Sequence, residues 1–221
     1  MGLIESKGNM YTWVTHTWNV IKGECPHGCT YCYMKRWGKQ KPVRFDKKEL
    51  KTDLGFDNII FVGSSCDMFA EDIPEKWILD TLDYCEKFFR NKYLFQSKNP
   101  KRMLEYNIYF PASIYCTTIE TNRYYEQMAD APHPIDRAVA MSNINANNNN
   151  CYVTIEPIMD FDLADLVFLI RQCDPIQVNI GADSGNNNLP EPSKEKILAL
   201  IDELKKFTVI DQKRNLTRLL K

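Results

Sequence analysis

Short apolar runs rich in β-branched residues alternate with amphipathic segments along most of the chain. The apolar runs predict β-strands and cover residues 15–21, 58–62, 93–96, 113–119, 151–155 and 177–180. The amphipathic segments predict helices and cover residues 47–53, 74–90, 100–106, 134–146, 163–172 and 193–207. Pro74, Pro100 and Pro134 open three of these helices, where a proline suits the first turn because no amide hydrogen bond is lost.

The alternation of strands and helices predicts right-handed crossovers and a parallel sheet. Six such units occupy about 200 residues, two units fewer than a complete TIM barrel contains. We therefore expect an α/β fold, an open partial (β/α)6 TIM-type barrel, with a flat doubly wound sheet as the alternative. Residues 1–221 are predicted to form one domain, with a core over about 13–207 and a closing segment over 208–221. The asparagine tract 147–150 predicts a loop.

Composition narrows the class of protein. Hydrophobic residues make up 44% of the chain, which is ample for a buried core, and the net charge of −1 gives no global attraction to nucleic acid or anionic membranes. No run of about 18 apolar residues is present, so no transmembrane helix is expected. Five of the cysteines are scattered without short spacings, which argues against a disulfide framework and favours a reducing, cytoplasmic location.

The remaining three cysteines, Cys25, Cys29 and Cys32, have the spacing Cys-x3-Cys-x2-Cys. The number of such matches expected by chance in this chain is about 0.01, so the spacing calls for a chemical explanation. Three thiolates can bind one 4Fe–4S cluster and leave its fourth iron open to a cofactor or substrate. A zinc loop with His27 as a further ligand, or two redox thiols beside an unrelated cysteine, remain as alternatives.

Small or polar residues follow every predicted strand. The cysteine loop follows the first strand, and the other strand ends carry residues 63–68, 97–99, 117–123, 156–157 and 181–185. In parallel α/β folds the carboxyl ends of the strands meet at one rim, where the active site lies. Six polar strand ends exceed what a purely structural barrel needs, so the sequence predicts one site at this rim.

Together these motifs resemble the radical SAM superfamily. The resemblance implies a 4Fe–4S cluster held by Cys25, Cys29 and Cys32, with S-adenosylmethionine bound to the open iron. It also implies cofactor contacts from the residue before the third cysteine and from the strand ends: Tyr31, Gly63, Ser64, Ser65, Asp67, Ser97, Thr118, Glu120, Asn122, Glu156, Gly181 and Ala182. The glutamate usual in the second-strand motif of the family is absent from 63–67, so backbone carbonyls, the serine hydroxyls or Asp67 must bind the methionyl amino group.

Four segments, 17–19, 61–67, 155–157 and 181–185, are together similar to a phage- and bacterium-encoded branch of radical-SAM-like proteins. That branch is distantly similar to spore photoproduct lyase, a DNA-repair enzyme, and the similarity runs from about residue 13 to 204. The resemblance implies that an external flavodoxin- or ferredoxin-type donor supplies one electron. Reductive cleavage of S-adenosylmethionine then gives a 5′-deoxyadenosyl radical that abstracts hydrogen from a substrate. The resemblance to this branch also implies a companion protein.

Further candidates concern catalysis and the substrate. Cys66 could return a hydrogen atom to a product radical, although free cysteines are commonly buried core residues. Glu156 is a second catalytic candidate because it ends a strand. The basic segment 35–44 is interrupted by one tryptophan, a pattern typical of single-strand binding, so a nucleotide or nucleic acid is the expected substrate. Its predicted contacts are Arg36, Trp37, Lys98 and Arg123. A peptide-modifying radical SAM enzyme and a non-catalytic iron–sulfur or metal sensor remain as alternatives.

Overall fold

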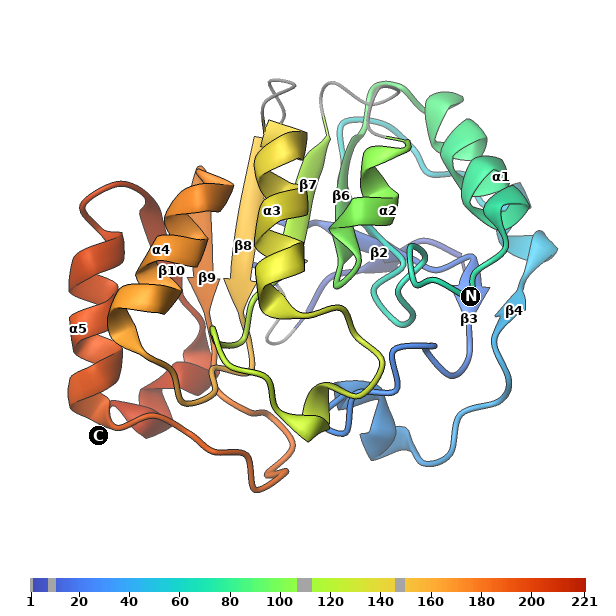
Figure 1. Cartoon of the computed structure of the whole chain (residues 1–221). Helices are drawn as coiled ribbons and strands as arrows, with labels where there is room; N and C mark the ends of the chain where they lie inside the picture. Colours follow the sequence, from blue (N-terminus) through green and yellow to red (C-terminus); the bar gives the residue numbers. More distant parts are fainter. Residues whose placement is uncertain (1, 8–10, 107–112, 146–149) are drawn as a thin grey trace.

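The computed structural model describes residues 2–7, 11–106, 113–145 and 150–221. Its main sheet has eight strands in the order β1-β2-β5-β6-β7-β8-β9-β10, and all neighbours from β2 to β10 are parallel (Figure 1). The strands are β1 (Ile4–Glu5), β2 (His16–Trp18), β5 (Ile59–Val62), β6 (Lys92–Ser97), β7 (Ile114–Thr118), β8 (Asn150–Ile155), β9 (Gln177–Ile180) and β10 (Val209–Gln212). The expected α/β fold is confirmed, and the barrel is open because β10 and the antiparallel strand β1 stand at opposite ends of the strand order.

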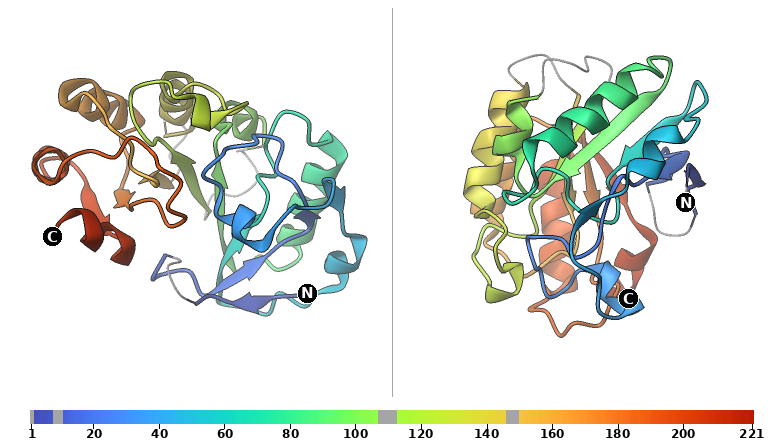
Figure 2. Two further views of the ribbon diagram at one scale, coloured as in Figure 1. Left: turned by 90° about the horizontal axis from the view of Figure 1, so that it is seen from below. Right: turned by 90° about the vertical axis from the view of Figure 1, so that its right-hand side faces the viewer.

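The helices lie along the outer side of the curved sheet (Figure 2). They are α1 (Glu75–Glu86), α2 (Pro100–Leu104), α3 (Pro134–Asn145), α4 (Leu163–Cys173) and α5 (Lys194–Leu204), with the 3-10 turns η1 (Tyr33–Trp37), η2 (Lys47–Lys51), η4 (Glu126–Met128) and η5 (Arg214–Leu219). Side-chain caps fix two of the starts: Asn99 accepts from the backbone N–H of Arg102, and Ser193 accepts from that of Lys196. None of the described helices has the length and apolarity needed to cross a bilayer.

Several predicted boundaries need correction. The first predicted strand, 15–21, divides into β2 and β3 (Ile21–Lys22), and β3 pairs with β4 (Arg44–Phe45) in a separate ribbon. The helix expected at 47–53 is only the 3-10 turn η2, and the helix expected at 74–90 ends at Glu86. Asn150 belongs to β8 rather than to the predicted loop, whose other residues, like residue 146, lie outside the described residues.

The closing segment forms a strand and a turn. Strand β10 extends the sheet beside β9 with parallel pairing, from Val209 opposite Gln177 to Gln212 opposite Ile180. The sheet therefore has seven parallel strands where the pattern of the core predicted six. The 3-10 turn η5 follows at once and returns the chain to the strand ends of β8 and β9.

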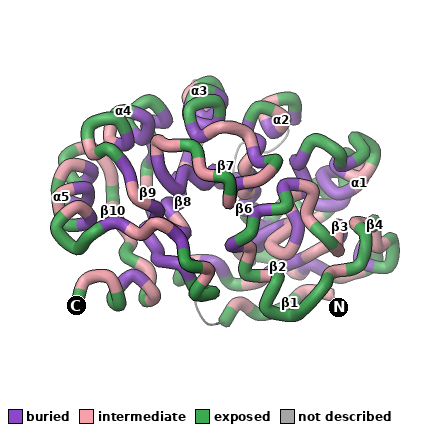
Figure 3. Tube along the Cα trace, turned by 60° about the horizontal axis from the view of Figure 1, so that its bottom comes forward, coloured by how far each residue is buried: buried purple, intermediate pink, exposed green. Residues whose placement is uncertain are grey.

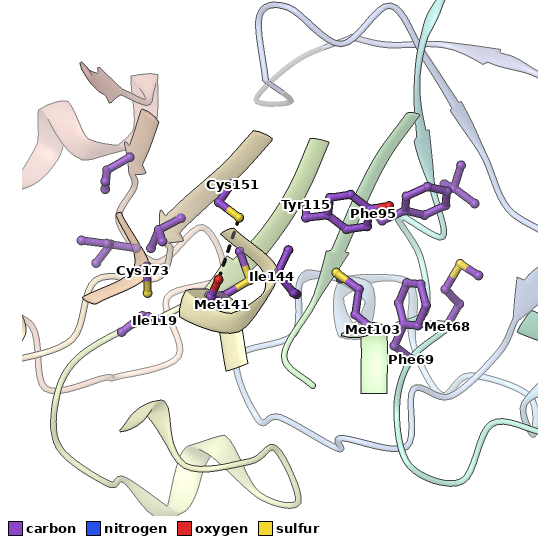
Figure 4. Close-up of a cluster of buried hydrophobic side chains, with 14 of the residues drawn as sticks. Met68, Phe69, Phe95, Met103, Tyr115, Ile119, Met141, Ile144, Cys151 and Cys173 are labelled. Atoms are coloured by element: carbon purple, nitrogen blue, oxygen red, sulfur yellow. Dashed lines mark hydrogen bonds between the residues drawn. The ribbon is translucent and has the colours of Figure 1, made fainter. Parts of the chain in front are cut away.

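The hydrophobic core fills the layer between the sheet and the helices. Buried positions follow the strands and the helix sides that face them (Figure 3). Phe95 and Tyr115 from neighbouring strands pack at 6.1 Å between ring centroids, and Phe69 packs against the same region (Figure 4). Cys151 and Cys173 are buried in this layer. Because helices and core occupy the outer side, the polar strand ends are left to the inner side and the rim.

Candidate functional site

A cavity of about 690 Å³ opens at the carboxyl ends of the parallel strands, and Cys25, Cys29 and Cys32 all line it. Its size lies within the range of small-molecule and cofactor sites. The predicted site residues in its wall are Tyr31, Arg36, Gly63, Ser64, Ser65, Asp67, Ser97, Lys98, Thr118, Glu156 and Ala182. The predicted residues that do not line it are Trp37, Cys66, Glu120, Asn122, Arg123 and Gly181.

Local backbone turns shape the cysteine loop. The N–H of Gly28 donates to the carbonyl of Cys25 at 3.0 Å, and the N–H of Cys32 donates to that of Cys29 at 3.2 Å. Gly28 has a φ of 65°, a left-handed conformation that glycine adopts without a steric penalty. These turns reverse the chain twice within eight residues, which brings all three cysteines to one cavity.

The three cysteines face one cavity without converging on one point. Within the described part of the chain, no group of three His, Cys, Asp or Glu side chains converges as the ligands of one metal ion do. A 4Fe–4S cube spreads its cysteine sulfurs over three irons, so it needs thiols that face one cavity rather than one point. The three cysteines meet that requirement. Among the described residues His27 does not converge with the cysteines as a ligand of one ion would, and its Nε2 is hydrogen-bonded to Asp67 at 2.8 Å.

The thiols differ in their readiness to lose a proton. A hydrogen bond from Cys66 lowers the pKa of Cys25 to about 6. Burial raises the pKa values of Cys29 and Cys32. The same hydrogen bond raises the pKa of Cys66 far above its ordinary range, so this thiol stays protonated and acts as the donor.

Asp67 is surrounded by hydrogen-bond donors. Its Oδ2 accepts from His27, from the hydroxyl of Ser97 at 2.9 Å and from the backbone N–H of Lys98 at 2.8 Å. Its Oδ1 accepts from the backbone N–H of Phe69 at 2.9 Å. Burial raises the pKa of Asp67, but His27 and the other donors outweigh burial and hold it below its ordinary value. Asp67, one of the three alternatives for binding the methionyl amino group, is thus already hydrogen-bonded to protein donors.

Glu120 is fully buried among three donors. The hydroxyl of Tyr31 donates to its Oε1 at 2.5 Å, the ammonium of Lys98 binds the same oxygen, and Arg137 donates to Oε2 at 2.7 Å. Burial raises the pKa of Glu120, yet the two cations hold it well below its ordinary range. Arg137 was missed by the sequence analysis, although a lone arginine on the apolar face of the helix predicted at 134–146 is a signal for a buried ion pair.

Glu156 has partners from the closing segment. Lys213 donates to its Oε2 at 2.6 Å and Asn215 to its Oε1 at 2.8 Å, while the Lys213 ammonium also lies 4.5 Å from the ring centroid of Tyr11. A Cβ at Gly181 would lie 2.7 Å from the Glu156 carboxyl, so a larger residue there would displace this side chain from its present position. Tyr11 and Lys213 line the cavity and were also missed, because neither lies in a recognisable motif.

Two of the predicted residues, Asn122 and Arg123, are hydrogen-bonded along the rim and do not line the cavity. Arg123 donates to Asp160 at 2.5 Å and to Asp162 at 2.6 Å, and Asn122 donates to Asp162 at 3.2 Å. These bonds fasten the segment after β7 to the segment after β8. Asn122 and Arg123 therefore hold the rim together in this structure instead of lining the cavity.

The basic segment 35–44 lies beside the cysteine loop, and we call it the lip of the cavity. Lys35, Arg36 and Lys39 line the cavity. Trp37 is 60% exposed, and the Arg36 guanidinium lies 4.3 Å from the centroid of its ring. The side chains of this segment are thus presented to solvent next to the cysteine loop.

Comparison with known structures defines the class of fold. The open barrel is similar in fold to spore photoproduct lyase: one mutant of that protein aligns with a TM-score of 0.69 and 11% identity, over 93% of this chain and 78% of the other. A doubly substituted mutant with bound AdoMet and dinucleoside spore photoproduct aligns with a TM-score of 0.61 and 11% identity, over 91% of this chain and 64% of the other. This chain thus spans less than two thirds of the protein in that complex.

Sequence comparison defines the family. Residues 9–191 match the family model described as "Protein of unknown function (DUF5131)", and the chain belongs to that family. No curated protein matches the sequence. The cavity residue Lys213 lies beyond the matched range, so the family model does not cover the whole cavity wall.

Proposed function

We propose that the protein is a radical SAM enzyme in which Cys25, Cys29 and Cys32 hold a 4Fe–4S cluster and S-adenosylmethionine fills part of the adjoining cavity. The observation that carries this proposal is that three thiols of the expected spacing line one cavity at the carboxyl ends of a parallel barrel. When bound, the cluster and cofactor supply one-electron cleavage of the sulfonium to a 5′-deoxyadenosyl radical, which abstracts hydrogen from a substrate.

The chain's own residues bind and orient the cofactor in this proposal. Asn19, after β2, accepts from the N–H of Ser65 at 2.9 Å and from its hydroxyl at 3.0 Å, and its amide donates to the Ser64 hydroxyl at 3.2 Å. The segment 63–65 is thereby held ready for the methionyl amino group. Glu156, oriented by Lys213, is the acceptor we assign to the ribose hydroxyls.

We further propose a nucleotide or nucleic acid as the substrate. The lip beside the cysteines combines the exposed Trp37 ring with basic side chains, and residues 33–45 contain no Asp or Glu. Basic groups that follow a phosphate backbone and aromatic rings that stack on bases are the means of single-strand recognition. The neighbour with bound dinucleoside spore photoproduct adds support by likeness of fold. The proposed partners remain an external flavodoxin- or ferredoxin-type electron donor and a companion protein.

The central experiment is anaerobic reconstitution with iron and sulfide, followed by S-adenosylmethionine and dithionite. We expect a brown, iron-loaded protein that forms 5′-deoxyadenosine, and a Cys29→Ala variant that does neither. Iron binding without 5′-deoxyadenosine would favour the sensor alternative, and tetrahedral zinc on the three thiols would refute the cluster.

The substrate class needs a separate measurement. Binding of single-stranded oligonucleotides is expected to weaken steeply with salt, because basic side chains that contact phosphates release counterions. Trp37→Ala should weaken binding by about 1–3 kcal/mol if a base stacks on the ring. Phe168→Ala on the outer side of α4, where the ring is 59% exposed, is the matched control. Salt-independent binding, or equal binding by both variants, would refute the assignment.

A further inference from the structure

The cysteine loop carries two side chains that bind buried carboxylates. Between the first and second cysteines, His27 is hydrogen-bonded through Nε2 to Asp67 at 2.8 Å. Between the second and third cysteines, Tyr31 donates its hydroxyl to Glu120 at 2.5 Å. His27 is 4% exposed and Tyr31 is 6% exposed, so both contacts are shielded from water. Each interval of the cysteine motif thus has its own attachment to the barrel.

The two carboxylates belong to one network. Asp67 follows β5 and Glu120 follows β7, and Lys98, after the intervening strand β6, contacts both. The backbone N–H of Lys98 donates to Asp67 at 2.8 Å, and its ammonium binds Glu120. Arg137, from α3, supplies Glu120 with a second cation at 2.7 Å. The attachment points of the loop therefore span three consecutive strand ends and one helix of the outer layer.

We propose that His27 and Tyr31 are positioning residues that the Asp67–Lys98–Glu120 network uses to hold the cysteine loop in its cluster-binding conformation before any cluster is present. This role rests on the proposed function, because it assumes that the loop binds a cluster. The contacts themselves are those of the metal-free protein. It assigns Asp67 and Lys98 to the support of the loop, where the sequence had suggested contacts to cofactor and substrate.

The physical reason is preorganisation. A free loop of this length would lose much conformational entropy when its three thiols are fixed by a cluster. Hydrogen bonds to charged groups are stronger than neutral ones, and they are stronger still away from water. A loop that is already held by two such bonds loses less entropy when it binds the cluster. Outer-shell partners of metal ligands raise metal affinity in the same way.

The test uses variants that remove one contact each. Tyr31→Phe removes only the hydroxyl that donates a hydrogen bond to Glu120. His27→Leu removes the ring nitrogen that bonds to Asp67. His27→Gln is the conservative variant, because its amide nitrogen can restore a donor to Asp67. Tyr125→Phe is the matched control, since its hydroxyl bonds to the backbone carbonyl of Asp160, outside the network.

The first readout is amide hydrogen exchange across residues 26–31 of the metal-free protein. We expect exchange to accelerate roughly tenfold for each lost hydrogen bond and further in the double variant, because each such bond holds the loop closed against opening. Strand β9 should keep its protection, which separates a local effect from general loss of stability. His27→Gln should restore slow exchange, and Tyr125→Phe should match the parent protein.

The second readout is the rate at which a chelator removes iron from the reconstituted protein. Loss of outer-shell partners lowers metal affinity by about 10–100-fold, so we expect faster iron loss of that order in the double variant. Parent-like exchange and parent-like iron loss in the double variant would overturn the inference. If the parent protein binds no iron, the proposed function fails, and the exchange experiment still decides whether the network holds the loop.

Discussion

Replacing Glu120 by Gln removes the negative charge that the Arg137 guanidinium and the Lys98 ammonium share. Glu120 and Arg137 have side chains that are 0% exposed, and Lys98 is 17% exposed. Removing one partner of a buried pair destabilises a protein by about 3–5 kcal/mol, because the other charge stays buried without compensation. Here two cations would lose the charge that compensates them, so we expect a loss at the upper end of that range.

Urea denaturation of the metal-free protein, followed by tryptophan fluorescence, measures this loss. With a loss of about 5 kcal/mol and a slope of about 2–3 kcal/mol per molar urea, the midpoint should fall by about 1.7–2.5 M. Asp57→Asn is the matched control, because it breaks an ion pair with Arg90 whose side chains are 62% and 57% exposed. Such exposed pairs contribute about 0–1 kcal/mol. A Glu120→Gln midpoint equal to that of Asp57→Asn would refute the reasoning.

Three further predictions follow from the same structure. The stability difference between the parent protein and Glu120→Gln should be constant from neutral pH to about 4.5 and should shrink at lower pH. The pKa of Glu120 is lowered in the folded state, so its carboxylate contributes stability that protonation removes. Urea titrations that show no change of the difference over this pH range would contradict the prediction. If the proposed cluster is bound, Cys66→Ala should lower its reduction potential by about 40 mV, since the hydrogen bond to Cys25 is lost, and Cys66→Ser should restore it in an EPR redox titration. Lys213→Met should weaken S-adenosylmethionine binding about tenfold in equilibrium dialysis, because Glu156 loses its orienting ammonium; unchanged affinity would exclude that role.

The sequence by itself determined the parts that depend on neighbours along the chain. Alternating apolar and amphipathic runs predicted every parallel strand of the core, because strand and helix periodicities are local properties. The cysteine spacing predicted three thiols on one loop, and the rule that strand ends share a rim predicted that Gly63–Ser65, Thr118 and Glu156 would meet them in one cavity. The boundaries were less accurate, as with the 3-10 turn at Lys47–Lys51, because terminal hydrogen bonds depend on packing.

Only the tertiary structure decided which charged groups face the cavity and which form ion pairs with each other. Glu156 meets Lys213 across 57 positions of sequence, and Arg137 reaches Glu120 from a helix of the outer layer. Arg123 has the residue type of a substrate contact but is bonded to Asp160 and Asp162. A buried charge is stable only beside a partner, and partners are chosen by distance in space, which the spacing of residues along the chain does not determine.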